Sequence, residues 1–109
     1  MQGKSVPIVL KDGKTRQLRF EWQQICRLEK EKGISLFDAA KEIVFEGKIS
    51  PIKITAIIWA GLIHEDEKLT IEQVEEFMEF SKISEYINVL SDAIDKALPE
   101  GDKSKEKKA

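Results

Sequence analysis

The sequence has little of the chemistry on which most enzyme and metal sites depend. Its 109 residues include one cysteine, one histidine and one tyrosine. The single cysteine, Cys26, excludes an internal disulfide and a cysteine-rich zinc site. No glycine-rich phosphate loop, GxSxG nucleophile turn or dinucleotide-binding fingerprint occurs along the chain. We therefore expect neither enzymatic activity nor a cofactor.

The sequence also lacks a long apolar run and a strong excess of charge of either sign. Its longest apolar stretch, residues 54–63, is interrupted by Thr55 and is too short to span a bilayer. The first residues do not contain the apolar core of a secretory signal. Because the formal net charge is only -2, no general attraction to nucleic acid or to an anionic membrane is expected. These absences predict a cytoplasmic protein.

The length and composition are those of one globular domain. The chain is 35% charged and 41% hydrophobic, which is ordinary for a domain with a single modest core. We expect this domain to cover residues 1–98. Residues 99–109 contain no large apolar side chain and four lysines, so they are expected to form a flexible charged tail.

A β-hairpin is expected at the start of the chain, within residues 6–20. Two β-favouring runs flank the turn signal Asp12-Gly13. Pro7 lacks a backbone donor and suits an edge strand. Because an isolated hairpin is marginally stable, this one should lie on helices or add to a neighbouring subunit's sheet.

The remainder of the chain predicts helices, which makes the fold class mainly α: an N-terminal hairpin followed by a compact bundle of four to five short helices. Apolar residues recur at helical spacing after each of several capping signals. A fifth apolar stripe, residues 83–98, either follows a break near Ser81 or continues the fourth helix. The first four helices are expected to begin near Glu21, Ser35, Ser50 and Thr70.

The third of these helices, residues 51–64, is apolar on nearly all sides. A small domain has difficulty covering such a helix completely, so part of its surface is expected to remain open for a partner. Trp59, Leu62 and Ile63 are the candidate partner-binding residues. Gly61 indicates the close approach of another helix or the start of a bend. Trp22, like Trp59, lies in an apolar helical pattern typical of core packing.

The only histidine, His64, precedes three acidic residues, and the group could be taken for a metal site. Adjacent positions in a short loop lack the i, i+4 geometry of zinc hydrolases, and the region has neither the alternating oxygens nor the glycine of a calcium-binding hand. A solvated helix end is the better interpretation. Cys26 has no histidine to activate it and is interpreted as a buried structural thiol. No metal site is therefore expected.

The order of several short motifs resembles the tail assembly chaperones of long-tailed bacteriophages and gene-transfer agents. Trp59-Ala60-Gly61-Leu62 precedes His64-Glu65-Asp66 and then a Leu69-Thr70 helix start. Upstream, Leu18-Arg19-Phe20 and Leu28-Glu29 occupy comparable places in the hairpin and first helix. The resemblance extends to Glu75 and so covers most of the chain.

This resemblance implies a non-enzymatic chaperone, encoded by a phage or prophage, that binds and solubilises the tape-measure protein and assists tail-tube polymerisation. The implied partners are the tape-measure and tail-tube proteins, and the implied location is the host bacterial cytoplasm, not the mature virion. Some members of the family make a longer product by ribosomal frameshifting, with which Lys107-Lys108 is compatible. The oligomeric state stays open.

Self-association and two alternative functions are also compatible with the sequence. A basic N-terminal region and an acidic region at residues 65–79 could orient self-association. A structural tail tube or completion protein retained in the virion is an alternative function. A small helical transcriptional regulator is another, but the fourth and fifth helices have acidic outer faces that phosphate would repel.

Overall fold

An antiparallel hairpin opens the described part of the chain, residues 5–97 of the computed structural model. Strand β1 (Val6–Val9) pairs with β2 (Thr15–Leu18). At the turn, Asp12 accepts hydrogen bonds from Lys14 N at 3.0 Å and from both terminal nitrogens of Arg16 at 3.0 and 2.8 Å. Gly13 takes the positive φ of 82° that the turn needs. The predicted hairpin is confirmed.

An ion pair between Arg16 and Asp12 stabilises the hairpin turn in addition to its backbone conformation. The hydrogen bonds from Arg16 and then from the Lys14 backbone lower the pKa of the Asp12 carboxyl from 3.8 to about 2. When folding lowers the pKa of a carboxyl group, that group stabilises the native state at pH values above the pKa that it has in the unfolded chain. The contribution of this pair is therefore present at neutral pH and is lost as the pH falls from about 4 towards 2.

Seven helical segments follow within the described residues, and the mainly α fold with an N-terminal hairpin is confirmed. The fourth helix ends at Glu76, so the alternative in which it continues into the fifth is wrong, and the break falls at residues 77–79, a few residues before its predicted position near Ser81. The segments are α1 (Trp22–Lys32), α2 (Leu36–Ala40), the π-helical η1 (Lys41–Phe45), α3 (Pro51–Leu62), α4 (Ile71–Glu76), the 3-10 turn η2 (Phe80–Lys82) and α5 (Ile83–Ala97).

The predicted capping residues set the helix starts. Ser35, Ser50 and Thr70 each accept a hydrogen bond from the backbone N–H three residues on. Such bonds satisfy amide groups that have no partner inside the helix. Gly33, with φ of 68°, ends α1 in the left-handed conformation. The predicted tail, residues 99–109, lies outside the described residues.

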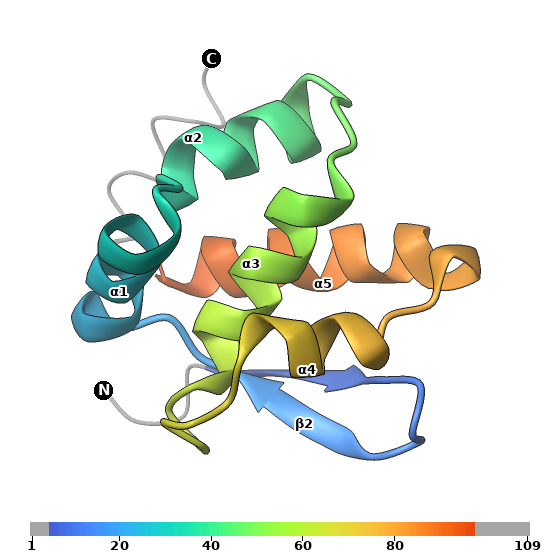
Figure 1. The fold of residues 1–109 in the computed structure, drawn as a ribbon. Helices are drawn as coiled ribbons and strands as arrows, with labels where there is room; N and C mark the ends of the chain where they lie inside the picture. The colour runs from blue at the N-terminus through green and yellow to red at the C-terminus, as the bar shows by residue number, and fades with distance from the viewer. Residues whose placement is uncertain (1–4, 98–109) are drawn as a thin grey trace.

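Helix α3 passes through the middle of the molecule, with α1 beside it, α5 behind it, and α4 and the hairpin across its C-terminal end (Figure 1). Residues 54–63 of this segment are all buried. The hairpin supplies the side of the core that the helices leave uncovered, since β2 contacts α3 and β1 contacts α5. None of the helices between residues 5 and 97 is long and apolar enough to cross a bilayer.

Both edges of the hairpin are unsuited to adding a further strand. Pro7 has no N–H to offer on β1. On β2, His64 Nε2 donates a hydrogen bond to the carbonyl of Gln17 at 2.7 Å. The hairpin therefore lies on helices, as the first of the two predicted alternatives states, and its edges disfavour the second.

Gly61 is required by the packing of β2 on α3. A Cβ at this position would lie 2.8 Å from Leu18 Cδ2 and 3.0 Å from Phe20 Cζ. The backbone is also close, because Arg19 N donates to the Gly61 carbonyl at 2.9 Å. The expected close approach is confirmed, but the approaching element is the hairpin and not another helix.

Gly61→Ala is expected to lower the free energy of unfolding by up to about 2 kcal/mol. Overpacking against Leu18 costs about 1 to 3 kcal/mol, and the better helix propensity of alanine returns about 1 kcal/mol. Urea denaturation followed by circular dichroism measures the change. In a Leu18→Ala background, which removes the nearest atom, the same substitution should be neutral or stabilising. An equal loss in both backgrounds would contradict the packing explanation.

Candidate functional site

The three residues predicted to bind a partner are part of the core. Trp59 is 2% exposed, and Leu62 and Ile63 are each 3% exposed. The expectation that they line an open surface of α3 is wrong for this fold. Ile52, at the N-terminal end of α3, is instead the exposed apolar residue of that helix, at 72%.

Side-chain contacts at the C-terminal end of α3 link this helix to α1 and to the turn before α4. Trp59 Nε1 donates to the Leu69 carbonyl at 2.8 Å, and the ring lies beneath the cationic groups of Arg27 and Lys32, at 5.4 and 5.0 Å from its centroid. Asp66 accepts from Lys68 N at 3.0 Å and so forms the turn before α4. This run, which carries the family resemblance, therefore has a structural role.

His64 and Cys26 differ somewhat from their predicted surroundings. His64 is half-buried and bridges to β2, whereas a solvated helix end was expected. Cys26 is half-buried rather than fully buried. Within residues 5–97, no group of three or more histidine, cysteine, aspartate or glutamate side chains is arranged to hold a metal ion.

Trp22 is 80% exposed, so its predicted core position is also wrong. The buried face of α1 is formed by Gln24 and Leu28. Gln24 turns inward because its side chain accepts a hydrogen bond from Glu21 N at 3.0 Å and caps the helix start. Trp22, at the first helical position, consequently points away from that face.

Exposed apolar residues are concentrated around α2 and η1. Seven large hydrophobic residues are exposed in the described part of the chain, and four of them fall within residues 37–52. The four are Phe37 at 46%, Phe45 at 72%, Ile49 at 47% and Ile52 at 72%. Scattered exposed apolar residues are normal, but a concentration of this kind often marks a binding surface.

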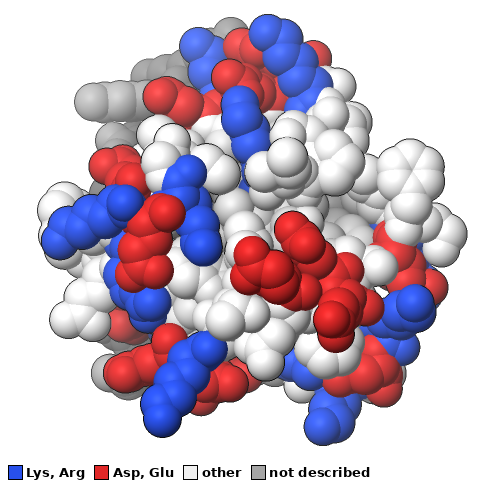
Figure 2. Space-filling model, in the orientation of Figure 1, with Lys and Arg blue, Asp and Glu red and all other residues white. Residues whose placement is uncertain are grey.

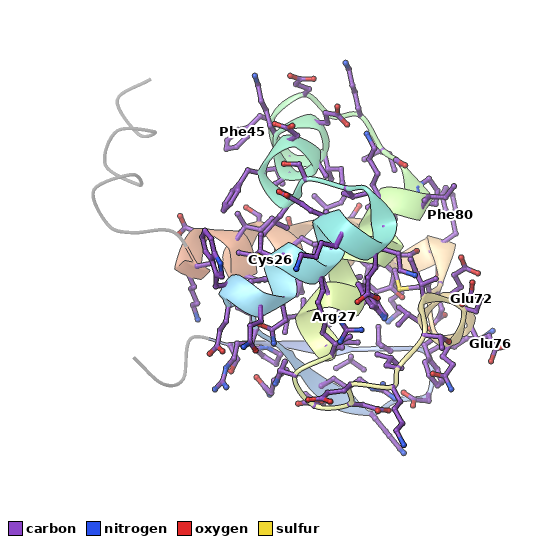
Figure 3. All side chains as sticks on the ribbon, turned by 60° about the vertical axis from the view of Figure 1, so that its left-hand side comes forward. Cys26, Arg27, Phe45, Glu72, Glu76 and Phe80 are labelled. Carbon is purple, nitrogen blue, oxygen red and sulfur yellow. The ribbon has the colours of Figure 1, made fainter. Side chains whose placement is uncertain are left out.

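A groove of about 750 Å³ lies between α2–η1 and α5. In the view of Figure 1 the chain runs in opposite directions along the two walls, and Figure 3 shows that the two helical axes cross. Leu36, Ala39 and Ile43 bury one stripe of α2–η1 in the core, while a second stripe faces the groove. The groove is lined by Phe37, Asp38, Ala40, Lys41, Val44 and Phe45 on the first wall and by Ser91, Asp92, Ile94 and Asp95 on α5.

The first wall owes its shape to the π-helical turn. Glu46 N donates to Lys41 O at 3.1 Å, five residues back, which widens the helix. A salt bridge of 2.6 Å between Glu42 and Lys53 of α3 holds this turn against the core. The hydrogen bond from Lys53 lowers the pKa of the Glu42 carboxyl. Short π-helical turns occur frequently at functional sites.

The rim of the groove is acidic. Asp38 on the first wall and Asp92 on α5 are exposed and contribute one carboxylate from each side of the groove, and Lys41 contributes an ammonium group from the first wall. The acidic groups next in sequence to the first wall are paired, Glu42 with Lys53 and Glu46 with Lys48. The groove therefore combines an apolar floor with a negative edge.

A second acidic region lies over α4, away from the groove. Glu72, Glu75 and Glu76 are exposed, and acidic side chains gather on the corresponding face (Figure 2). Figure 3 shows Glu72 and Glu76 close together on α4, and Phe45 on a separate part of the surface. A shallower hollow of about 310 Å³ beside α4 has a mixed lining that includes Arg16 and Phe77. Leu62 and Leu69 also line this hollow, which has less than half the volume of the groove.

Comparison of the chain with family models, curated proteins and solved structures found no match.

The groove residues were missed by the sequence reasoning, although a signal for them exists. Phe37, Ala40 and Val44 are spaced by three and four residues and form a second helical stripe beside the core stripe. A helix with two apolar stripes has more apolar surface than one packing partner can cover. Helix α3 is also apolar on several sides, but there the hairpin and the neighbouring helices cover the apolar surface.

Proposed function

We propose that this protein is a non-enzymatic tail assembly chaperone whose groove between α2–η1 and α5 receives apolar helical segments of a tape-measure protein. The observation that carries the proposal is the second apolar stripe of α2–η1, with Phe45 72% exposed at its end. The resemblance in the order of the sequence motifs supplies the identity of the partner. A chaperone of this kind needs an apolar surface that a partner helix covers and a charged exterior that keeps the complex soluble.

The groove has the form that helix binding requires. The two helical walls leave a hollow against which a third helix can pack its own apolar stripe. By contrast, Pro7 and His64 block the edges of the hairpin, so binding of an extended segment by strand addition is disfavoured. The assignment of binding to the groove replaces the earlier expectation for Trp59, Leu62 and Ile63.

Phe45→Asp is expected to abolish solubilisation of the tape-measure protein while the fold stays native. The side chain is exposed, so a charge there costs little folding free energy, but it places a carboxylate where the partner's apolar face would pack. The measurement is the soluble fraction of the tape-measure protein encoded by the same genome when the two proteins are co-expressed. The expected loss of affinity is at least about tenfold, since aromatic hot spots contribute 2 kcal/mol or more.

Phe80→Asp is the matched control. Phe80 is 79% exposed, is the same residue type and lies apart from Phe45 (Figure 3). It should leave solubilisation unchanged. If the unmodified protein does not solubilise the tape-measure protein, or if Phe80→Asp is as damaging as Phe45→Asp, the proposal is wrong. Mass spectrometry of purified virions separates a chaperone, which should be absent, from a retained tube or completion protein.

A further inference from the structure

We infer that the groove selects amphipathic helices that carry lysine or arginine beside their apolar stripe. This inference rests on the proposed use of the groove as a helix-binding site, and it adds the chemical class of helix that the groove accepts. The two observations behind it are the apolar floor and the acidic rim, which the fold brings together from separate helices.

The apolar floor of the groove requires a bound helix to present apolar side chains at helical spacing. Phe37, Val44 and Phe45 lie along one wall, and Ile94 lies on the other. The α2–η1 wall is ten residues long, or about 15 Å at the rise of a helix. It therefore accommodates about three turns of a partner helix, which present two or three large apolar residues on one face.

The rim determines the charge of the residues that flank that stripe. Asp38 lies on the first wall and Asp92 lies on α5, so a carboxylate lies on each side of the floor. A helix seated on the floor places the residues beside its apolar stripe against these two edges. Lysine and arginine there are attracted, whereas glutamate and aspartate are repelled. Long basic side chains can also pack their methylene groups against the aromatic floor while the charged ends reach the rim.

A second acidic surface, on α4, distinguishes charge selection by the groove from a general electrostatic attraction of basic peptides to the protein. The chain also has exposed acidic groups on α4, including Glu72 and Glu75, but the hollow beside that helix has less than half the volume of the groove. Acidic charge thus exists on two surfaces, only one of which borders the larger groove. This difference supplies an internal control for the experiment.

The test uses two synthetic helical peptides of about 20 residues, a length at which isolated helices begin to be stable. Both have the same leucine and alanine stripe, flanked by lysine in one and by glutamate in the other. Dissociation constants are measured by isothermal titration calorimetry against the full-length protein. The lysine peptide is expected to bind at least about tenfold more tightly than the glutamate peptide, because attraction at the rim positions in one peptide is replaced by repulsion in the other.

Charge reversal in the protein locates the effect. The double variant Asp38→Lys, Asp92→Lys should weaken the lysine peptide about tenfold or more and strengthen the glutamate peptide. The control variant Glu72→Lys, Glu75→Lys changes the net charge by the same amount on α4 and should shift either dissociation constant by less than about twofold. Circular dichroism and thermal unfolding confirm that both double variants keep the fold.

Failure of the inference differs from failure of the proposed function. If the two peptides bind equally, if neither binds, or if the α4 variant has the same effect as the rim variant, charge selection by the groove is refuted even when the tape-measure protein is still solubilised. If the lysine peptide binds as expected but the tape-measure protein stays insoluble, the groove specificity stands and the chaperone function does not.

Discussion

Leu62→Asp is expected to destabilise the protein severely, as is Ile63→Asp. Each side chain is 3% exposed, within the core around α3. Burial of a single unpaired carboxylate costs several kcal/mol, in addition to the lost apolar packing. A domain of this size has a total stability of about 5 to 15 kcal/mol. Circular dichroism and denaturant titration measure the loss, which should exceed about 4 kcal/mol.

Ile52→Asp on the same helix is the control. Its side chain is 72% exposed, so the substitution should change the free energy of unfolding by no more than about 0.5 kcal/mol. A Leu62→Asp protein that keeps its native spectrum and loses only tape-measure solubilisation would restore the hypothesis that this part of α3 is a binding surface.

Trp59→Ala is expected to lower the free energy of unfolding by about 3 to 5 kcal/mol, the usual cost of removing a buried aromatic side chain. The ring is 2% exposed, and its nitrogen donates to the Leu69 carbonyl, which ties α3 to the turn before α4. Loss of the ring also removes the surface on which the cationic groups of Arg27 and Lys32 rest. Urea denaturation at neutral pH measures the change.

Two further variants separate the contribution of the Trp59 hydrogen bond from that of its burial. Trp59→Phe keeps most of the apolar volume and removes the donor, so it should lose about 1 to 3 kcal/mol from the unsatisfied carbonyl and the smaller ring. Trp22→Ala, at a position 80% exposed, should lose no more than about 0.5 kcal/mol. Equal losses at Trp22 and Trp59 would contradict the difference in burial between the two tryptophans.

Local rules predicted most of the fold because the capping and turn signals act over a few residues. Ser35, Ser50 and Thr70 accept the hydrogen bonds that helix starts require wherever the helices end up in space. The Asp12-Gly13 turn likewise depends on its own backbone and on Arg16. These elements could be predicted without knowledge of the tertiary structure.

The candidate site was less predictable because exposure depends on distant segments. An apolar stripe shows that a helix face is suitable for burial, but it does not identify what covers that face. Trp59 and Leu62 are covered by segments before and after α3 in the chain, whereas Phe37 and Phe45 are left exposed. Both outcomes are compatible with the same helical periodicity.

The sequence alone determined the hairpin, the helix starts, the order of the elements and the apolar character of α3, since these follow from backbone conformation and from hydrogen bonds between near neighbours. The tertiary structure decided which apolar surface remains open. The hairpin packs its Leu18 against Gly61 and closes the core around α3, while α2–η1 and α5 meet along only part of their apolar faces. That difference is set by the distances between elements remote in sequence, which is why the groove became apparent only in the folded chain.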